Sequence, residues 1–185
     1  MTARPMQRGF TLSETLAVLA VAGIGLSLAA PSLKSLSGRN QQAVSVNQLV
    51  STMHLARSEA VMRNARVAVC ASATGESCDG RAWEDGWIAF VDADANQERA
   101  AGEMLIDHIT ALPGLRLRSA EFAQSFAYRP DGRVIAADGA ARTGEFAFCE
   151  PGATAAARVV IVRASGLPTL AQQHRDGSSS GCDHS

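Results

Sequence analysis

The chain has 185 residues, of which 46% are hydrophobic and 19% are charged. This balance excludes a mainly disordered chain and allows one compact core with an appendage. The 17 basic and 18 acidic residues give a net charge of -1, which argues against a protein whose whole surface binds nucleic acid. A local basic stripe is still compatible with this composition.

The first thirty residues combine a short basic stretch with a long apolar run. Arg4 and Arg8 lie within residues 1–9, and the apolar run covers residues 10–30. A helix of this length rises about 31 Å, which matches the hydrocarbon thickness of a bilayer. Because the basic residues precede the run, the positive-inside rule predicts a cytoplasmic leader, one membrane span and an extracytoplasmic remainder.

Glu14 distinguishes this run from a plain membrane anchor. A carboxylate costs about 2.5–3.5 kcal/mol at the bilayer centre and less near an end, so its presence predicts a specific role. The alternative is a cleaved secretory signal peptide with a small-x-small site at residues 27–29. The apolar region of a signal peptide is shorter and normally carries no acidic residue, which favours the anchor.

After Pro31 the apolar residues recur at helical spacing, and they predict an amphipathic helix that ends near Asn64. The predicted apolar face consists of Val46, Leu49, Val50, Met53, Ala56, Arg57 and Ala60. The predicted polar side consists of Gln41, Gln42, Asn47, Ser51 and Ser58. Together with the apolar run, this stem predicts one helix of roughly 50 residues.

From residue 65 the apolar period shortens to that of strands. Strand-like runs cover residues 67–70, 87–91, 104–109, 122–128, 134–137, 145–149 and 158–162. Turn signals rich in Gly, Pro and Asp separate them, as in an antiparallel meander or small sandwich. The predicted fold class is therefore α+β, with a long N-terminal α-helix packed on an antiparallel β-sheet or sandwich.

These patterns predict five segments along the chain. The segments are a cytoplasmic leader at 1–9, a transmembrane and assembly helix at 10–30, an amphipathic stem at 31–64, a β-rich domain at 65–173 and a flexible Gly/Ser-rich tail at 174–185.

Residues 9–14, with the sequence GFTLSE, resemble the class III signal of type IV pilins and type II secretion pseudopilins. The resemblance implies that a prepilin peptidase cuts between Gly9 and Phe10 and that Phe10 is N-methylated. It also implies that Glu14 neutralises a terminal amine during assembly. The physical interpretation agrees, because a carboxylate in an apolar bundle is tolerable when a cation pairs with it.

Two further motifs narrow the resemblance to the GspH/FimT group of minor pseudopilins and minor pilins. They are residues 83–92, which follow Cys70 and Cys78, and the turn at residues 128–133. The resemblance implies a structural subunit of a type II secretion pseudopilus or a type IV pilus. Its partners would be other pilin or pseudopilin subunits, and it would be a single-pass inner-membrane protein with a periplasmic C-terminal domain.

Trp87 is predicted to be a core residue, and Trp83 to cover a sheet edge.

All four cysteines follow the predicted span, where an even number indicates disulfides. Three connectivities are open. We favour a bond between Cys70 and Cys78 and a second between Cys149 and Cys182. Paired C-x-x-C spacing, which a zinc site would need, is absent, so we expect no metal at the cysteines.

The acidic residues of 92–103 place their oxygens at EF-hand-like offsets, as in a calcium-binding loop. Gln97 replaces the usual glycine, Arg99 brings a cation into the loop, and the flanks resemble strands rather than helices. These departures favour a solvated acidic hairpin loop with no bound metal.

DNA binding is the alternative function, because pilus-associated members of the group resemble DNA receptors that carry a C-terminal Gly-Arg-x-Arg motif. In this sequence Gly166 is followed by Leu167 and Thr169 where the two arginines would stand. The remaining candidate DNA contacts are Arg158, Arg163 and Arg175, although we favour the interpretation that they are solvated surface residues.

No catalytic or dinucleotide-binding motif is present, so neither an enzyme nor a cofactor is expected.

Overall fold

The computed structural model describes residues 11–79, 81–112, 114–149 and 158–171, with the backbone alone for residues 25–39. The chain divides into two compact units, Met1–Gln41 and Gln42–Ser185. Each unit is described by itself below.

One helix, α1, covers Leu12–Arg63 and continues through Pro31. Its N-terminus is capped by Thr11, whose Oγ1 accepts a hydrogen bond of 3.4 Å from the Glu14 main-chain N–H. Its C-terminus ends in a left-handed residue, Asn64, with φ of 50°. The Ala65 N–H then bonds to the Ala60 carbonyl at 3.2 Å, as in a Schellman motif. The predicted end near Asn64 is confirmed.

Among the residues whose side chains the structure describes, no helix is both long enough and apolar enough to cross a membrane. The span predicted over residues 10–30 extends beyond those residues.

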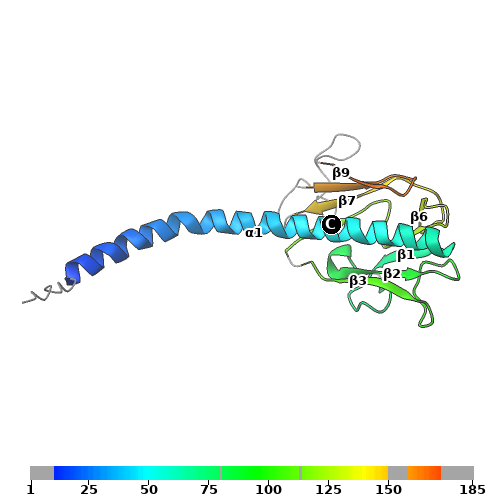
Figure 1. The fold of residues 1–185 in the computed structure, drawn as a ribbon, viewed down its shortest axis with the longest axis horizontal. Coiled ribbons are helices and arrows are strands. Elements are labelled where there is room, and N and C mark those ends of the chain that lie inside the picture. Colours follow the sequence, from blue (N-terminus) through cyan, green and yellow to red (C-terminus); the bar gives the residue numbers. More distant parts are fainter. Residues whose placement is uncertain (1–10, 80, 113, 150–157, 172–185) are drawn as a thin grey trace, which may run out of the picture. The chain divides into compact units, whose positions relative to one another are not determined.

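Nine strands form two antiparallel sheets in the described part of the chain (Figure 1). The larger sheet has the order β3-β2-β1-β5-β6, and the smaller has the order β4-β7-β8-β9. The strands are β1 Val67–Ala71, β2 Gly86–Val91, β3 Leu105–Thr110, β4 Arg116–Arg118, β5 Ser125–Tyr128, β6 Val134–Ala136, β7 Gly144–Cys149, β8 Arg158–Val162 and β9 Pro168–Ala171. The predicted α+β class is confirmed.

Seven of these strands correspond to predicted runs, whereas β4 and β9 were not predicted. The predicted run at 122–128 is too long, because the strand begins at Ser125. Phe122 precedes it in a turn, in which its N–H donates to Ser119 Oγ at 3.2 Å.

The main core lies between the C-terminal part of α1 and both sheets, and Figure 1 shows this part of the helix across them. The helix contributes five apolar side chains with no exposed surface, Val46, Leu49, Met53, Ala56 and Ala60. The predicted apolar face is thereby confirmed. The prediction for Gln42 is wrong, because this side chain is buried and donates to the Phe148 carbonyl of β7 at 3.5 Å. Its amide can be buried because it retains a hydrogen bond.

Trp83 lies inside this core, so the prediction that it covers a sheet edge is wrong. It begins a 3-10 turn, Trp83–Asp85, and is 2% exposed. Its indole contacts Phe126 of the larger sheet and Phe146 of the smaller one, with ring centroids 5.8 and 5.1 Å away. The turn places the indole where the two sheets meet. The core position predicted for Trp87 is confirmed, since it has no exposed surface.

A short polar chain crosses from the larger sheet to the helix. The Trp87 indole N–H donates to Thr52 Oγ1 at 3.2 Å, and this hydroxyl donates to Asp107 Oδ2 at 2.8 Å. Asp107 belongs to β3, the edge strand of the sheet. The pairing of β3 with β2 also shifts register between Ala89 and Phe90. These two hydrogen bonds therefore hold the edge strand β3 against the helix at one point.

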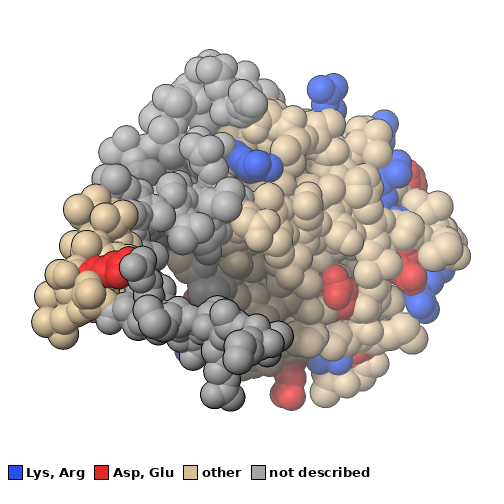
Figure 2. Space-filling view, turned by 60° about the vertical axis from the view of Figure 1, so that its left-hand side comes forward, with Lys and Arg blue, Asp and Glu red and all other residues tan. Residues whose placement is uncertain are grey.

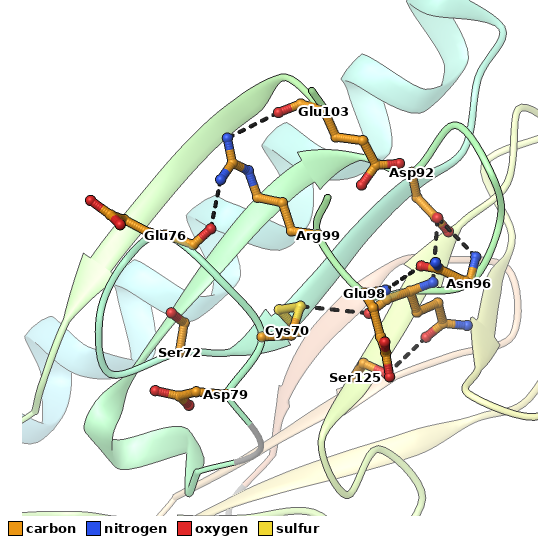
Figure 3. Close-up of a disulfide and its surroundings, with 12 residues drawn as sticks. Cys70, Ser72, Glu76, Asp79, Asp92, Asn96, Glu98, Arg99, Glu103 and Ser125 are labelled. Carbon is orange, nitrogen blue, oxygen red and sulfur yellow. Dashed lines mark hydrogen bonds between the residues drawn. A yellow bond between two sulfur atoms is a disulfide. The ribbon is translucent and has the colours of Figure 1, made fainter. Parts of the chain in front are cut away.

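A second, smaller core lies on the opposite face of the larger sheet. Its buried members are Ala68, Cys70, Ile88, Phe90, Ala127 and Ile135. The half-buried Cys78 packs against this cluster, and its sulfur lies 3.6 Å from the main-chain oxygen of Gln97. The loops that follow β1 and β2 therefore meet over this face, and they hold the next two candidate sites (Figure 3).

Candidate assembly, disulfide and acidic-loop sites

The N-terminal part of α1 carries a solvent-exposed apolar surface. Six large apolar side chains between residues 12 and 24 are 59–80% exposed. They are Leu12, Leu16, Val18, Leu19, Val21 and Ile24. A Cβ added at Gly23 would meet nothing within 4 Å. Apolar surface of this extent on one helix is typical of a segment that packs against other molecules.

Glu14 lies in the exposed first turn of α1. A carboxylate there interacts favourably with the N-terminal end of the helix dipole. The predicted processing residues Gly9 and Phe10 lie outside the described residues. Glu14, the predicted assembly carboxylate, thus lies at the start of the exposed apolar segment.

The disulfide predicted between Cys70 and Cys78 is confirmed (Figure 3). It joins β1 to the following loop, with a distance of 5.6 Å between the two Cα atoms. Cys149, at the end of β7, is also disulfide-bonded. Cys182 lies outside the described residues, so its pairing with Cys149 stays a prediction.

The loop between β2 and β3 gathers three carboxylates. Oxygens of Asp92, Asp94 and Glu103 all lie within 4.8 Å of one another. Asp92 Oδ1 accepts hydrogen bonds from the main-chain N–H groups of Asn96 at 3.0 Å and Gln97 at 3.3 Å. Asp92 is 2% exposed, and its Oδ2 is buried with no hydrogen-bond partner among the described residues.

The environment of Asp92 disfavours its ionised form. Burial raises the pKa of its carboxyl above the ordinary value, whereas the bonds from Gln97 and Asn96 and the charge of Arg66 lower it. The nearby Glu103 carboxylate raises it further. Burial is the largest of these effects, so the pKa of the Asp92 carboxyl is raised overall.

The two candidate DNA contacts that the structure describes, Arg158 and Arg163, do not form one patch. Arg158 is half-buried at the start of β8, and the exposed Arg163 follows the end of this strand. Five residues at about 3.3 Å each separate them by about 17 Å. Arg175 lies outside the described residues. On the face seen in Figure 2, basic side chains alternate with acidic ones along the right-hand side.

Two hairpin turns meet at Arg57 of α1, an arrangement that the sequence did not predict. Arg57 Nε donates to the Gly132 carbonyl at 3.1 Å, in the turn between β5 and β6. A Cβ at Gly166, in the turn between β8 and β9, would lie 2.0 Å from this same carbonyl oxygen. The Tyr128 ring adjoins this junction, and burial raises the pKa of its phenol, although the charge of Arg57 lowers it.

The sequence profile described as type II transport protein GspH matches residues 45–166. A second profile, the prokaryotic N-terminal methylation motif, matches residues 4–30. No curated protein matches the chain closely enough to count as a relative.

Solved structures of minor pilins share the fold. The type IV minor pilin FimU of Pseudomonas aeruginosa, in crystals of space group P21, has a TM-score of 0.55 at 18% identity, covering 74% of this chain and 92% of FimU. A second crystal form, in space group P65, gives 0.52 at 18% identity, with 70% and 91% covered. The minor pseudopilin EpsH of the Vibrio cholerae type 2 secretion system gives 0.47 at 12% identity, with 71% and 97% covered.

Proposed function

The chain belongs to the GspH family of type II transport proteins, and on this premise we propose that it is a structural filament subunit that assembles through the N-terminal part of α1. It would be a minor pseudopilin of a type II secretion system or a minor pilin of a type IV pilus. The chain has the pilin-like α+β fold of such subunits.

The observation that carries this proposal is the exposed apolar segment of α1. Its six large apolar side chains are more than half exposed to solvent. Small residues, including Ala17, Ala20 and Gly23, alternate with them and allow close approach of another helix. Packing against the equivalent helices of other subunits would bury this surface.

The same segment supports a specific maturation route. The match of residues 4–30 to the methylation motif supports cleavage by a prepilin peptidase between Gly9 and Phe10. Before assembly, the apolar run at residues 10–30 would anchor the chain in the inner membrane, with the β domain in the periplasm. The disulfide between Cys70 and Cys78 supports an oxidising compartment.

Glu14→Ala is expected to reduce incorporation of the chain into filaments at least tenfold, while leaving the β domain folded. The reason is that a cleaved chain begins with a cationic amine, which needs a carboxylate partner inside the helix bundle. Incorporation is measured as the ratio of chain in sheared filaments to chain in cells. Circular dichroism of the purified full-length variant in detergent micelles reports folding.

Two matched variants control this experiment. Glu14→Asp keeps the charge and is expected to restore part of the incorporation. Glu98→Ala removes an exposed carboxylate from the β domain and is expected to leave incorporation unchanged. Normal incorporation of Glu14→Ala would contradict the role assigned to this carboxylate.

DNA binding is a second candidate, favoured by one observation. The turn that holds Arg163 lies beside the turn that holds Arg129 and Arg133, since the Val134 N–H bonds to the Ala164 carbonyl at 3.3 Å. All three arginines are exposed. A pilus-tip module that captures DNA could use these side chains in place of the two arginines of the family motif.

If the chain binds DNA in this way, the double variant Arg129→Ala/Arg163→Ala should lower the salt slope of duplex binding by about 2, at about 0.9 per phosphate contact. Full-length chain in non-ionic detergent is titrated against labelled duplex at several salt concentrations. Arg81→Ala, which removes an exposed arginine from another loop, should leave the slope unchanged. Absence of binding at low salt would leave the filament subunit as the function.

A further inference from the structure

The spacing of the oxygen-bearing residues in the β2–β3 loop matches that of a twelve-residue calcium loop. Asp92, Asp94 and Asn96 occupy the first, third and fifth positions, and Glu103 occupies the twelfth. The flanking elements are strands rather than the helices of an EF-hand. The question is therefore whether this loop retains the local geometry that a cation needs.

Gln97 stands where calcium loops carry a glycine, yet it keeps the backbone conformation of that glycine. Its φ is 60°, in the left-handed region that glycine favours. Its side chain is buried and anchored: Nε2 donates to the Ala136 carbonyl at 2.9 Å, and Oε1 accepts from Ser125 Oγ at 3.0 Å. These bonds to β5 and β6 offset the backbone strain and hold the turn in place.

Arg99 does not compete for the carboxylates. Its guanidinium donates to the main-chain oxygens of Glu76 at 2.6 Å and Glu103 at 3.0 Å. In Figure 3 it points away from Asp92 and Asn96, with the Glu103 side chain between them. Arg66, whose charge acts on Asp92, donates from its guanidinium to the Ala95 carbonyl at 3.0 Å. Among the described residues, no Lys or Arg forms a salt bridge with Asp92, Asp94 or Glu103.

The carboxylates already have the orientation of ligands. Main-chain N–H groups of Ala93 and Ala100 donate to the two oxygens of Glu103, at 2.8 and 2.9 Å. This clamp turns the Glu103 carboxylate toward Asp92 and Asp94, within the 4.8 Å that encloses the three groups. The buried Asp92 Oδ2 has no hydrogen-bond partner among the described residues, although buried polar atoms usually have one.

We propose that the β2–β3 loop is a calcium site, in which Asp92, Asp94 and Glu103 supply carboxylate oxygens and Asn96 lies at the remaining side-chain position. The cluster offers only oxygen ligands, which suits a hard cation and not zinc. Calcium accepts irregular sets of six to eight oxygens, whereas magnesium demands a near-ideal octahedron. A bound Ca²⁺ would supply the missing partner of Asp92 Oδ2.

This site would also stabilise the face of the sheet beneath it. The loop is tied to β5 and β6 through Gln97, and the oxygen of Gln97 contacts the disulfide sulfur of Cys78. A cation that holds the β2–β3 loop in place would therefore also stabilise the packing of this loop and Cys78 over the second core. This inference is independent of the filament function proposed above.

The test uses full-length chain in non-ionic detergent, freed of divalent cations by EGTA and then by dialysis. Titration calorimetry with CaCl₂ is expected to show one equivalent bound, and 5 mM CaCl₂ is expected to raise the thermal midpoint by about 5 °C. Glu103→Gln and Asp94→Asn should each weaken binding at least tenfold. Asp94 is exposed, so its variant keeps the test interpretable if a variant of the buried Asp92 fails to fold.

Glu98→Gln is the matched control, because this exposed side chain lies in the same loop but at a position that calcium loops fill with a main-chain carbonyl. It should bind Ca²⁺ like the parent chain. No heat or midpoint shift with the folded parent chain at 5 mM CaCl₂ would overturn the proposal. Unchanged binding by both Glu103→Gln and Asp94→Asn would overturn it too, as would equal or tighter binding of MgCl₂.

Discussion

Gly166→Ala is expected to lower the free energy of unfolding by about 3 kcal/mol or more, from a strained backbone and an overpacked contact together. Gly166 has φ of +84°, and an added Cβ would lie 2.0 Å from the Gly132 carbonyl oxygen. Arg57 Nε and the Tyr128 ring would each lie 3.1 Å away. Because the obstructing atom is main chain, two hairpin turns must separate to admit one methyl group.

The measurement is urea unfolding of the full chain in detergent, followed by tryptophan fluorescence. Gly139→Ala is the matched control, because Gly139 has φ of +78° but an added Cβ there meets nothing within 4 Å. It isolates the backbone strain, which costs about 1 kcal/mol. If both variants lost the same stability, the contact between the two turns would not explain the requirement for glycine at Gly166.

Trp83→Ala is expected to lower the free energy of unfolding by about 4 kcal/mol, in the range measured for large aromatic residues in cores. The indole fills the junction between the two sheets, against Phe126 and Phe146. Its Nε1–H also donates to the Phe122 carbonyl at 2.8 Å. Truncation would leave both a cavity and a carbonyl without this partner. Urea unfolding followed by circular dichroism measures the loss.

Trp83→Phe separates these two contributions. It keeps most of the apolar area and removes the donor, so it is expected to cost about 1–2 kcal/mol. Trp87→Phe is a second comparison. It also removes an indole donor, but from a hydroxyl acceptor, Thr52 Oγ1 at 3.2 Å, and not from a main-chain carbonyl. A loss for Trp83→Phe as large as that for Trp83→Ala would show that the hydrogen bond, and not the filled volume, dominates.

Periodicity predicted the helix and most of the strands, because each of their apolar side chains is buried in one core and the burial repeats at the spacing of the element. Leu49 and Met53 repeat at helical spacing and pack against both sheets. Val67 and Val69 face the main core, whereas Ala68 and Cys70 face the second one. A strand that is buried on both faces appears as a continuous apolar run.

The two missed strands lack such a pattern. β4 contains one buried apolar residue, Leu117, between two arginines. β9 begins at Pro168, which normally indicates a turn, and its Thr169 and Leu170 are exposed. Both are edge strands of the smaller sheet, where proline is tolerated at the first position. Only the tertiary pairing with β7 and β8 identifies them.

The candidate sites were predicted unevenly, because short-range motifs can be seen in sequence and long-range contacts cannot. The bond between Cys70 and Cys78 spans eight residues, and it was predicted. The contact of Arg57 with Gly132 spans 75 residues, and nothing local indicates it. For Gln97, the missing glycine argued against a cation site. The bonds that hold its backbone, to Ala136 and Ser125, appear only in the fold.

The polar chain from Trp87 through Thr52 to Asp107 has a consequence for the behaviour of many copies held together. An exposed edge strand can recruit a strand from a neighbouring molecule, and proteins prevent this with inward-pointing charges and irregular pairing. β3 has both, since Asp107 is directed toward the helix and the ladder with β2 is interrupted between Ala89 and Phe90. Globular domains held close together would thus resist edge-to-edge pairing into a shared sheet. Each copy could then separate from its neighbours with its own fold intact.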